Sequence, residues 1–168
     1  PTIWGWAAPG EEVTVSIGDN KASTKTNDAG DWRVQLKPLT AGDKVEMTVQ
    51  GKNTIKLTNI LVGEVWLGSG QSNMQWSVNA SNDPDLEKAA AKFPRLRMVN
   101  VPQVGTQEPQ WNFNGKWQTC TPDSVGNFSA VGYFFAREIQ AKLKVPIGLI
   151  HSSAGATAAE AWVSGEAP

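Results

Sequence analysis

The sequence has one cysteine and one histidine among its 168 residues, and this scarcity excludes several kinds of chemistry. Cys120 has no second cysteine to pair with, so an internal disulfide is impossible and the redox compartment stays open. The sequence contains no cysteine–histidine cluster of the kind that binds zinc. Any serine–histidine mechanism must therefore use His151 or a histidine from outside these residues.

A long apolar run and a strong net charge are also missing. No stretch approaches the roughly 20 apolar residues that a membrane-spanning helix needs. The formal net charge is −1, which gives no reason to expect nucleic acid, a membrane surface or a strongly anionic partner. Apolar residues nevertheless make up 40% of the chain, with eight tryptophans, and this content is sufficient for a folded core.

Apolar and polar residues alternate through the first part of the chain, as expected for strands with one face in a core and one in water. The clearest runs are residues 13–17, 32–36 and 45–49, separated by turn residues. Short strands at this spacing predict an antiparallel β-sandwich. We assign it to residues 1–58, with Trp4, Trp6 and Trp32 filling its core.

The pattern changes in the stretch LVGEVWLGSGQSNM, residues 61–74. It opens as an apolar run typical of a strand buried on both faces, Trp66 included. It then breaks at residues 68–70, and Ser72 follows. Glycines allow the tight backbone that turns a side chain outward after a strand, and an α/β enzyme places its nucleophile at such a turn.

The neighbours of Ser72 leave two interpretations open. The hydrolase pattern G-x-S-x-G is half matched, because Met74 stands where the second glycine would be. The serine is flanked by Gln71 and Asn73, and the Asn73 amide can donate to a developing oxyanion. The alternative is an exposed loop serine without a chemical role.

Residues 59–168 alternate between strands and helices. We expect a helix that starts at Asp83 and ends near Lys92, a strand over 95–101, and a helix that Ser129 caps. A strand over 147–150 and a helix from Thr157 follow. This order predicts a doubly wound, three-layer α/β fold with a parallel sheet. The small-residue turns after Leu67 and after Ile150 should then lie at the same edge of that sheet. The helix after Ser129 should bury the stripe Val131, Phe135, Ile139 and Leu143 and turn Arg137 to water.

These segments together resemble the sialate O-acetylesterase family, carbohydrate esterases of the wider SGNH-hydrolase type. The matching motifs extend over nearly the whole chain: IWGWAAPGEEVTV, NDAGDW, LVGEVWLGSGQSNM, FSAVGYFFAREIQ, VPIGLIHSS and EAW. The resemblance implies that residues 1–58 are an N-terminally incomplete accessory sandwich. It implies that residues 59–168 are the first half of a flavodoxin-like catalytic domain that is incomplete at its C-terminal side.

The resemblance also implies the chemistry of the site. Ser72 would attack an acetyl ester on sialic acid or another carbohydrate and form an acetyl-enzyme, with no metal or cofactor. The oxyanion would be bound by the backbone N–H groups of Ser72 and Gly155 and by the Asn73 side chain. Further residues are expected to contact the substrate: Gln71, Trp76, Thr157 and Glu160. Trp76, Trp111 and Trp117, which lie in predicted loops, are candidates for a sugar platform.

The loop HSSAGATAAEAW departs from the pattern expected for the family, roughly SSWGGTPxEAW, at Ala154, Ala156 and Ala158. Ala156 replaces a glycine, so a positive φ at this position would strain the loop by about 1 kcal/mol or more. The missing tryptophan at position 154 removes a wall of the sugar site.

The family's Asp-x-x-His and Q-G-E motifs are absent from these residues. We therefore expect a C-terminal segment or a second chain to supply the general base, and the isolated fragment to be inactive. The chain would be a nicked subunit or a truncated piece. His151 is the alternative base; otherwise it is a structural histidine in its loop.

The alternative function is a catalytically inactive carbohydrate-binding or interaction module on an esterase scaffold. Because acetylated glycans lie outside cells, we expect a secreted or periplasmic protein.

Overall fold

The computed structural model describes residues 1–106, 108 and 110–163. The chain divides into two compact units, Pro1–Val62 and Gly63–Pro168. The division therefore falls after Val62, a few residues beyond the boundary expected near Thr58. No helix in the described residues is long and apolar enough to cross a membrane.

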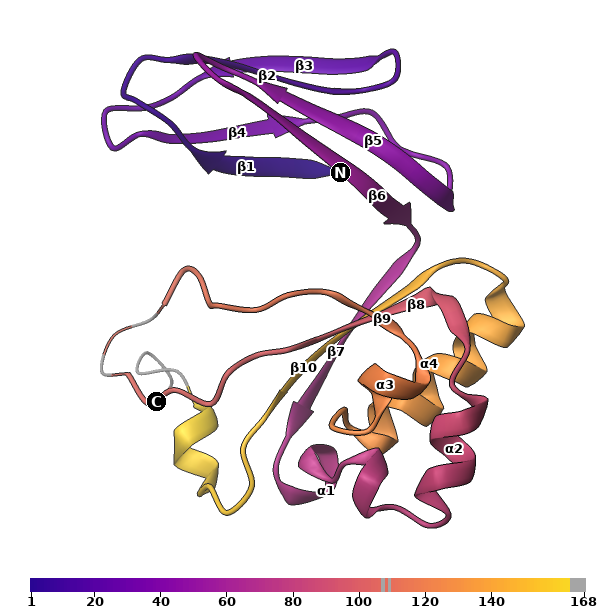
Figure 1. The fold of residues 1–168 in the computed structure, drawn as a ribbon. Coiled ribbons are helices and arrows are strands. Elements are labelled where there is room, and N and C mark those ends of the chain that lie inside the picture. Colours follow the sequence, from indigo (N-terminus) through magenta and orange to yellow (C-terminus); the bar gives the residue numbers. More distant parts are fainter. Residues whose placement is uncertain (107, 109, 164–168) are drawn as a thin grey trace. The chain divides into compact units, whose positions relative to one another are not determined.

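The first unit consists of two antiparallel sheets (Figure 1). The smaller sheet pairs β1 (Thr2–Trp6) with β4 (Asp31–Gln35), and the larger has the strand order β3-β2-β5-β6. Its strands are β2 (Glu12–Ile17), β3 (Asn20–Lys25), β5 (Gly42–Gln50) and β6 (Thr54–Val62). One core cluster draws side chains from both sheets, namely Val13 and Val15 of β2, Trp32 and Val34 of β4, and Met47 of β5. The alternating pattern thus marks the buried face correctly in β2 and β4.

Two of the three tryptophans expected in this core lie outside it. Trp32 is buried, but Trp4 and Trp6 are 53% and 56% exposed and contact each other edge to face. Both lie at even positions of β1, on the opposite face from Ile3, which packs against the core. The prediction that Trp4 and Trp6 fill the core is therefore wrong, because strand alternation points them away from it.

The second unit is organised around a sheet with the order β7-β10-β8-β9. Strands β7 (Glu64–Gly70), β10 (Ile147–Ser153) and β8 (Phe93–Asn100) are parallel, and the short β9 (Gln118–Cys120) is antiparallel to β8. In the register, Ser153 lies beside Gly70 and His151 beside Asn100. The carboxyl ends of the three parallel strands therefore meet at one edge of the sheet, and the turns after β7 and β10 share it, as predicted from the sequence.

Strand β7 is more exposed than its sequence predicts. It lies at the edge of the sheet, and Val65 and Leu67 are 62% and 66% exposed, with Trp66 also exposed. The sequence predicts burial on both faces, and the described residues alone do not provide it. An apolar run reports what a strand is able to bury, whereas the burial depends on the elements that cover it.

Helices α2 (Pro84–Ala90), α3 (Pro122–Val125) and α4 (Ala130–Leu143) lie on one side of this sheet (Figure 1). The shorter elements are α1 (Ser72–Gln75), η1 (Val78–Ala80) and η2 (Ala159–Trp162). The predicted cap of α4 is confirmed, because Ser129 Oγ accepts a hydrogen bond of 3.1 Å from the Gly132 N–H. Buried side chains of β8, β10 and α4 form the core of the unit: Leu96, Met98, Ile147, Leu149, Tyr133 and Ala136.

Helix α4 packs on the sheet mainly through residues outside the predicted apolar stripe. Its buried residues are Ala130, Gly132, Tyr133 and Ala136, while Val131, Phe135 and Leu143 are exposed. Within that stripe, Ile139 is partly buried and packs against the core. A Cβ atom at Gly132 would lie 2.6 Å from Leu149 Cδ2. The close approach of α4 to β10 therefore favours a glycine there. On the exposed side of α4, Phe135 contacts Trp66 edge to face.

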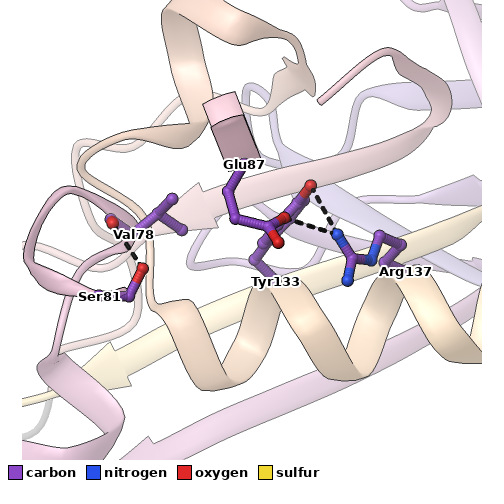
Figure 2. Close-up of polar contacts among 5 residues, drawn as sticks. All are labelled: Val78, Ser81, Glu87, Tyr133 and Arg137. Carbon is purple, nitrogen blue, oxygen red and sulfur yellow. Dashed lines mark hydrogen bonds and ion pairs between the residues drawn. The ribbon is translucent and has the colours of Figure 1, made fainter. Parts of the chain in front are cut away.

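The half-buried Arg137 joins α4 to α2 (Figure 2). Its Nη1 atom donates to Glu87 Oε2 at 2.7 Å and to the Tyr133 hydroxyl at 3.4 Å. The guanidinium also lies over the rings of Tyr133 and Phe134. The expectation that Arg137 faces water is therefore wrong, because its charge has a carboxylate partner between two helices. In the same view, the Ser81 hydroxyl donates to the Val78 carbonyl and closes the turn after η1.

Candidate active site

The turn between β7 and α1 presents Ser72 at the carboxyl edge of the sheet. Strand β7 ends at Gly70, whose φ of +142° lies in a region that favours glycine. Helix α1 begins immediately at the exposed Ser72. Backbone hydrogen bonds from Gln75 N to Gln71 O and from Trp76 N to Ser72 O close the turn. The strand-to-helix turn predicted around this serine is thus present.

Gly155 lies directly opposite Ser72. The pairing of β7 with β10 continues past the strand ends, because Ala154 N donates to Gly70 O at 3.1 Å. A Cβ atom placed on Gly155 would lie 3.2 Å from Ser72 Oγ and 3.5 Å from Ser72 Cα. The two loops that the sequence assigns to one edge therefore meet, and a side chain at position 155 would press against the serine hydroxyl.

Gln75, which was not singled out from the sequence, lies between these two residues. The Gly155 N–H donates to Gln75 Oε1 at 2.5 Å. The N–H therefore points to the Gln75 side chain beside Ser72, and its hydrogen-bonding capacity is satisfied within the protein. A sequence signal did exist, because Gln75 is three residues after Ser72 and shares one face of a helical turn with it.

Two other predicted substrate contacts hold the loop together. Gln71 Nε2 donates to the Thr157 carbonyl oxygen. Thr157 Oγ1 donates to Ala154 O at 2.8 Å and accepts from Trp162 Nε1 at 2.8 Å. These bonds connect the serine loop to the segment after β10, so Gln71 and Thr157 position the Gly155 loop relative to Ser72.

The remaining predicted residues lie at the surface around the turn. Asn73 and Glu160 are exposed, and the structure gives neither a hydrogen bond to Ser72 within the described chain. Trp76 is exposed, and its Nε1 atom donates to Ala80 O at 2.7 Å. Trp111 is 87% exposed and lines a separate cavity with Phe113, whereas Trp117 lies against the Gly148 position of β10. Trp117 is also 46% exposed, so one part of its ring faces solvent.

Ala156 has a positive φ of +59°, the condition under which strain was expected. We predict that Ala156→Gly raises the free energy of unfolding of the complete protein by about 1 kcal/mol, because glycine adopts this backbone without the Cβ conflict. Denaturant unfolding measures this difference. Ala158→Gly is a matched control, since Ala158 has a φ of −75°. This substitution should either leave the free energy of unfolding unchanged or lower it. Equal effects of the two substitutions would contradict the prediction.

His151 is directed at Ser153 and not at Ser72. Its Nδ1 atom lies 2.9 Å from Asn100 Oδ1, and its Nε2 atom lies 2.6 Å from Ser153 Oγ. Because Asn100 Oδ1 accepts from Nδ1–H, Nε2 is left to accept the Ser153 hydroxyl. The ring is buried and contacts Phe128 edge to face. This arrangement favours the structural alternative for His151 over a role as the base of Ser72.

Burial lowers the pKa of His151, partly opposed by a hydrogen bond with the Met74 backbone. In the unfolded chain the His151 ring titrates near pH 6.5. Between that pH and the lower pKa of the folded state, the unfolded chain binds a proton at His151 that the folded chain does not bind. Stability should therefore fall as the pH is lowered from about 6.5 toward the folded pKa. Denaturant unfolding of the complete protein at about pH 7.5 and 5.5 should show a larger loss for the wild type than for His151→Gln. Parallel pH dependences would refute this assignment.

Comparison with known proteins adds to this geometry. No family model matches the chain. Human sialate O-acetylesterase is 32% identical over 186 residues, which cover 97% of this chain and 35% of that protein. The rat sialate O-acetylesterase is 34% identical over 185 residues, with 96% and 34% covered. A crystal structure of a carbohydrate acetylesterase from Xanthomonas citri matches with a TM-score of 0.94 at 38% identity, over 97% of this chain and 38% of that one.

Fold and site together define a mixed α/β protein with the architecture of a carbohydrate acetylesterase and a serine at the carboxyl edge of its parallel sheet. The resemblance inferred from the sequence motifs is confirmed: the chain is a homologue of the sialate O-acetylesterases over nearly its whole length. It spans about a third of the length of those relatives. Within the described residues, no group of three or more His, Cys, Asp or Glu side chains could hold a metal ion.

Proposed function

We propose that the protein containing this chain is a serine esterase that removes O-acetyl groups from carbohydrates, with Ser72 as its nucleophile. The observation that carries the proposal is the approach of the exposed Ser72 hydroxyl to the Gly155 backbone at the end of two adjacent parallel strands. Homologues named sialate O-acetylesterase and a structural neighbour named carbohydrate acetylesterase support the class of substrate.

The chemistry follows from this arrangement. The Ser72 oxygen attacks the acetyl carbonyl while a general base takes the hydroxyl proton, and the sugar oxygen leaves with a proton from that base. Water then hydrolyses the acetyl-enzyme and releases acetate. The N–H groups of Ser72 and Gly155 and the Asn73 amide would stabilise the tetrahedral oxyanion. The Gln75 amide oxygen must first leave the Gly155 N–H, because the two oxygens would occupy the same place.

The general base is assigned to a segment or second chain that carries the Asp-x-x-His motif. His151 is bonded to Asn100 and Ser153, so it is not available to Ser72 in this arrangement. Exposed apolar residues on β7, together with the outward stripe of α4, support the presence of further covering elements.

We further propose that the first unit is an accessory sandwich and the second is the first half of an SGNH-type domain. The isolated 168-residue chain should then be inactive.

A second candidate is an inactive carbohydrate-binding or interaction module. Two observations favour it, namely the strained Ala156 and the Gly155 N–H that is already bonded within the protein. Binding of a glycan without release of acetate by the complete protein would support this candidate and reject the esterase.

The esterase is tested by rapid quenching of the complete protein during turnover of 4-nitrophenyl acetate. Proteolysis and mass spectrometry should find one acetyl group on the peptide that contains Ser72. Acetylation confined to another residue would contradict the assignment of the nucleophile.

Because acetylated glycans lie outside cells, we also propose a secreted or periplasmic location, which fractionation of the producing cells tests.

A further inference from the structure

Three side chains at the carboxyl ends of β8 and β10 are arranged as a nucleophile, a base and a group that orients the base. Ser153 Oγ lies 2.6 Å from His151 Nε2, and His151 Nδ1 lies 2.9 Å from Asn100 Oδ1. These are the two hydrogen bonds of a serine–histidine–asparagine triad, which is recognised by its geometry and not by the order of its residues in the chain. The mechanism proposed for Ser72 uses none of the three.

The pairing of two parallel strands holds these groups together. In β10, His151 and Ser153 are two positions apart, so both side chains project from the same face of the sheet. Asn100 is the last residue of β8 and lies beside His151 in the parallel register. The edge-to-face contact with Phe128 further restrains the imidazole ring. The sheet therefore gives all three groups the rigid support that a reactive site needs.

The hydrogen bonds also place the protons as a nucleophilic serine requires. The Asn100 oxygen accepts the Nδ1 proton of His151, which leaves Nε2 to accept the hydroxyl proton of Ser153. Burial lowers the pKa of His151, so the ring is neutral at about pH 7 and able to take that proton. An asparagine orients the ring but lacks the charge by which an aspartate stabilises the imidazolium. The reaction at Ser153 should therefore be slow.

The three residues open onto a cavity of about 370 Å³, which all of them line. This volume lies within the range of roughly 300–1,000 Å³ that is common for small-molecule sites. Gln75 and Asn127 also line the cavity, and their amide N–H groups can donate to an oxygen that gains charge during acyl transfer. A small reagent can thus reach Ser153 through the cavity, although the residue is buried.

We infer that Ser153 is a second reactive serine, with His151 as its base and Asn100 as the positioning residue, and that it takes small acyl groups from activated donors. Ser153 Oγ forms a bond to the acyl carbon while His151 Nε2 takes the hydroxyl proton. The bond between that carbon and the leaving group breaks, and the leaving group departs with the electron pair and the proton from Nε2. The bound acyl group then occupies the cavity by which water would approach His151, so each chain is modified once and does not turn over.

The first experiment treats the complete Ser72→Ala protein with methanesulfonyl fluoride, a small activated donor whose serine product is stable. Proteolysis and mass spectrometry should find one methanesulfonyl group on Ser153, with the release of fluoride. Ser153→Ala in the same background should remove this label. Ser152→Ala is the matched control, because the neighbouring side chain projects from the opposite face of β10, and it should keep the label. An unmodified Ser153 in the Ser72→Ala protein would overturn the inference.

The second experiment measures the rate of labelling at Ser153 after changes to the other two residues, with the free energy of unfolding as a check on folding. His151→Gln should lower this rate by about 10²-fold, the lower end of what a general base contributes. Asn100 is exposed, and Asn100→Asp should raise the rate about tenfold, because a carboxylate stabilises the imidazolium. Hydrogen bonds that only support the fold would give no faster reaction. Rates equal to that of the Ser72→Ala protein in both variants would overturn the inference.

The same reagent on the wild type separates this inference from the proposed function. A label on Ser153 without one on Ser72 would support the second reactive serine and count against Ser72 as the esterase nucleophile. A label on Ser72 alone would do the opposite. Because labelling at Ser153 is slow, rapid quenching during ester turnover reports on Ser72.

Discussion

Ester hydrolysis by the complete protein should fall by about 10³-fold or more when Ser72 is replaced by alanine. In a serine hydrolase the nucleophile supplies the covalent route, and its removal leaves only the rate enhancement from binding and from the oxyanion donors. Here the hydroxyl is exposed at the end of β7, and its removal leaves Gly155 and Gln75 in place. The substitution should therefore act on kcat, with little effect on stability.

The measurement is acetate release from 4-nitrophenyl acetate and from an acetylated sugar, with the free energy of unfolding as a check on folding. Ser69→Ala is the matched control, because Ser69 is also exposed and lies three positions earlier, inside β7. It should keep nearly full activity. Undiminished turnover by Ser72→Ala would remove Ser72 as the nucleophile, and with it the esterase mechanism proposed for this site.

Gly155→Ala should reduce kcat/KM by about 10²-fold, comparable to the loss of one oxyanion donor. The new Cβ would lie 3.2 Å from Ser72 Oγ and 2.6 Å from Gln75 Oε1, in the space that the substrate carbonyl must enter. Gly155 does not have a positive φ, so alanine can adopt its backbone. The nearest atom belongs to the end of a flexible side chain, which can move, and we therefore expect a small change in stability.

Gly42→Ala is the control for this substitution, since its added Cβ would come no closer than 4.0 Å to the nearest atom. Steady-state kinetics on 4-nitrophenyl acetate, a small substrate, isolates the effect at the serine from effects on sugar binding. Full activity of Gly155→Ala would mean that the carbonyl enters from another direction, and that the Gly155 N–H is not an oxyanion donor.

The alternating strands of the first unit, the glycine-rich turn before Ser72 and the cap of α4 were predictable, because each depends on residues close together in the chain. The cap is an example, since Ser129 and Gly132 are three residues apart. The meeting of the Ser72 and Gly155 loops was also predictable, because the carboxyl ends of parallel strands share one edge of a sheet.

The differences between prediction and structure concern which face of an element the described residues cover. The stripe on α4 and the apolar run of β7 show that a sequence records how apolar a face is, but not which neighbour reaches it. Gly132 is what brings α4 close to Leu149, and this contact joins residues far apart in the chain. The positions of Trp4 and Trp6 depend in the same way on which side of β1 meets the larger sheet.

The sequence by itself indicated the class of homologous proteins, the exposed serine after β7 and the loop that faces it, because these follow from local turns, from strand order and from motifs. It also defined the condition for strain at Ala156. Only the tertiary structure decided that this condition is met, that Gln75 Oε1 accepts the Gly155 N–H and that the His151 ring contacts Ser153 Oγ. Each of these depends on a backbone angle or a side-chain direction that is settled by packing between distant segments, which spacing along the chain does not encode.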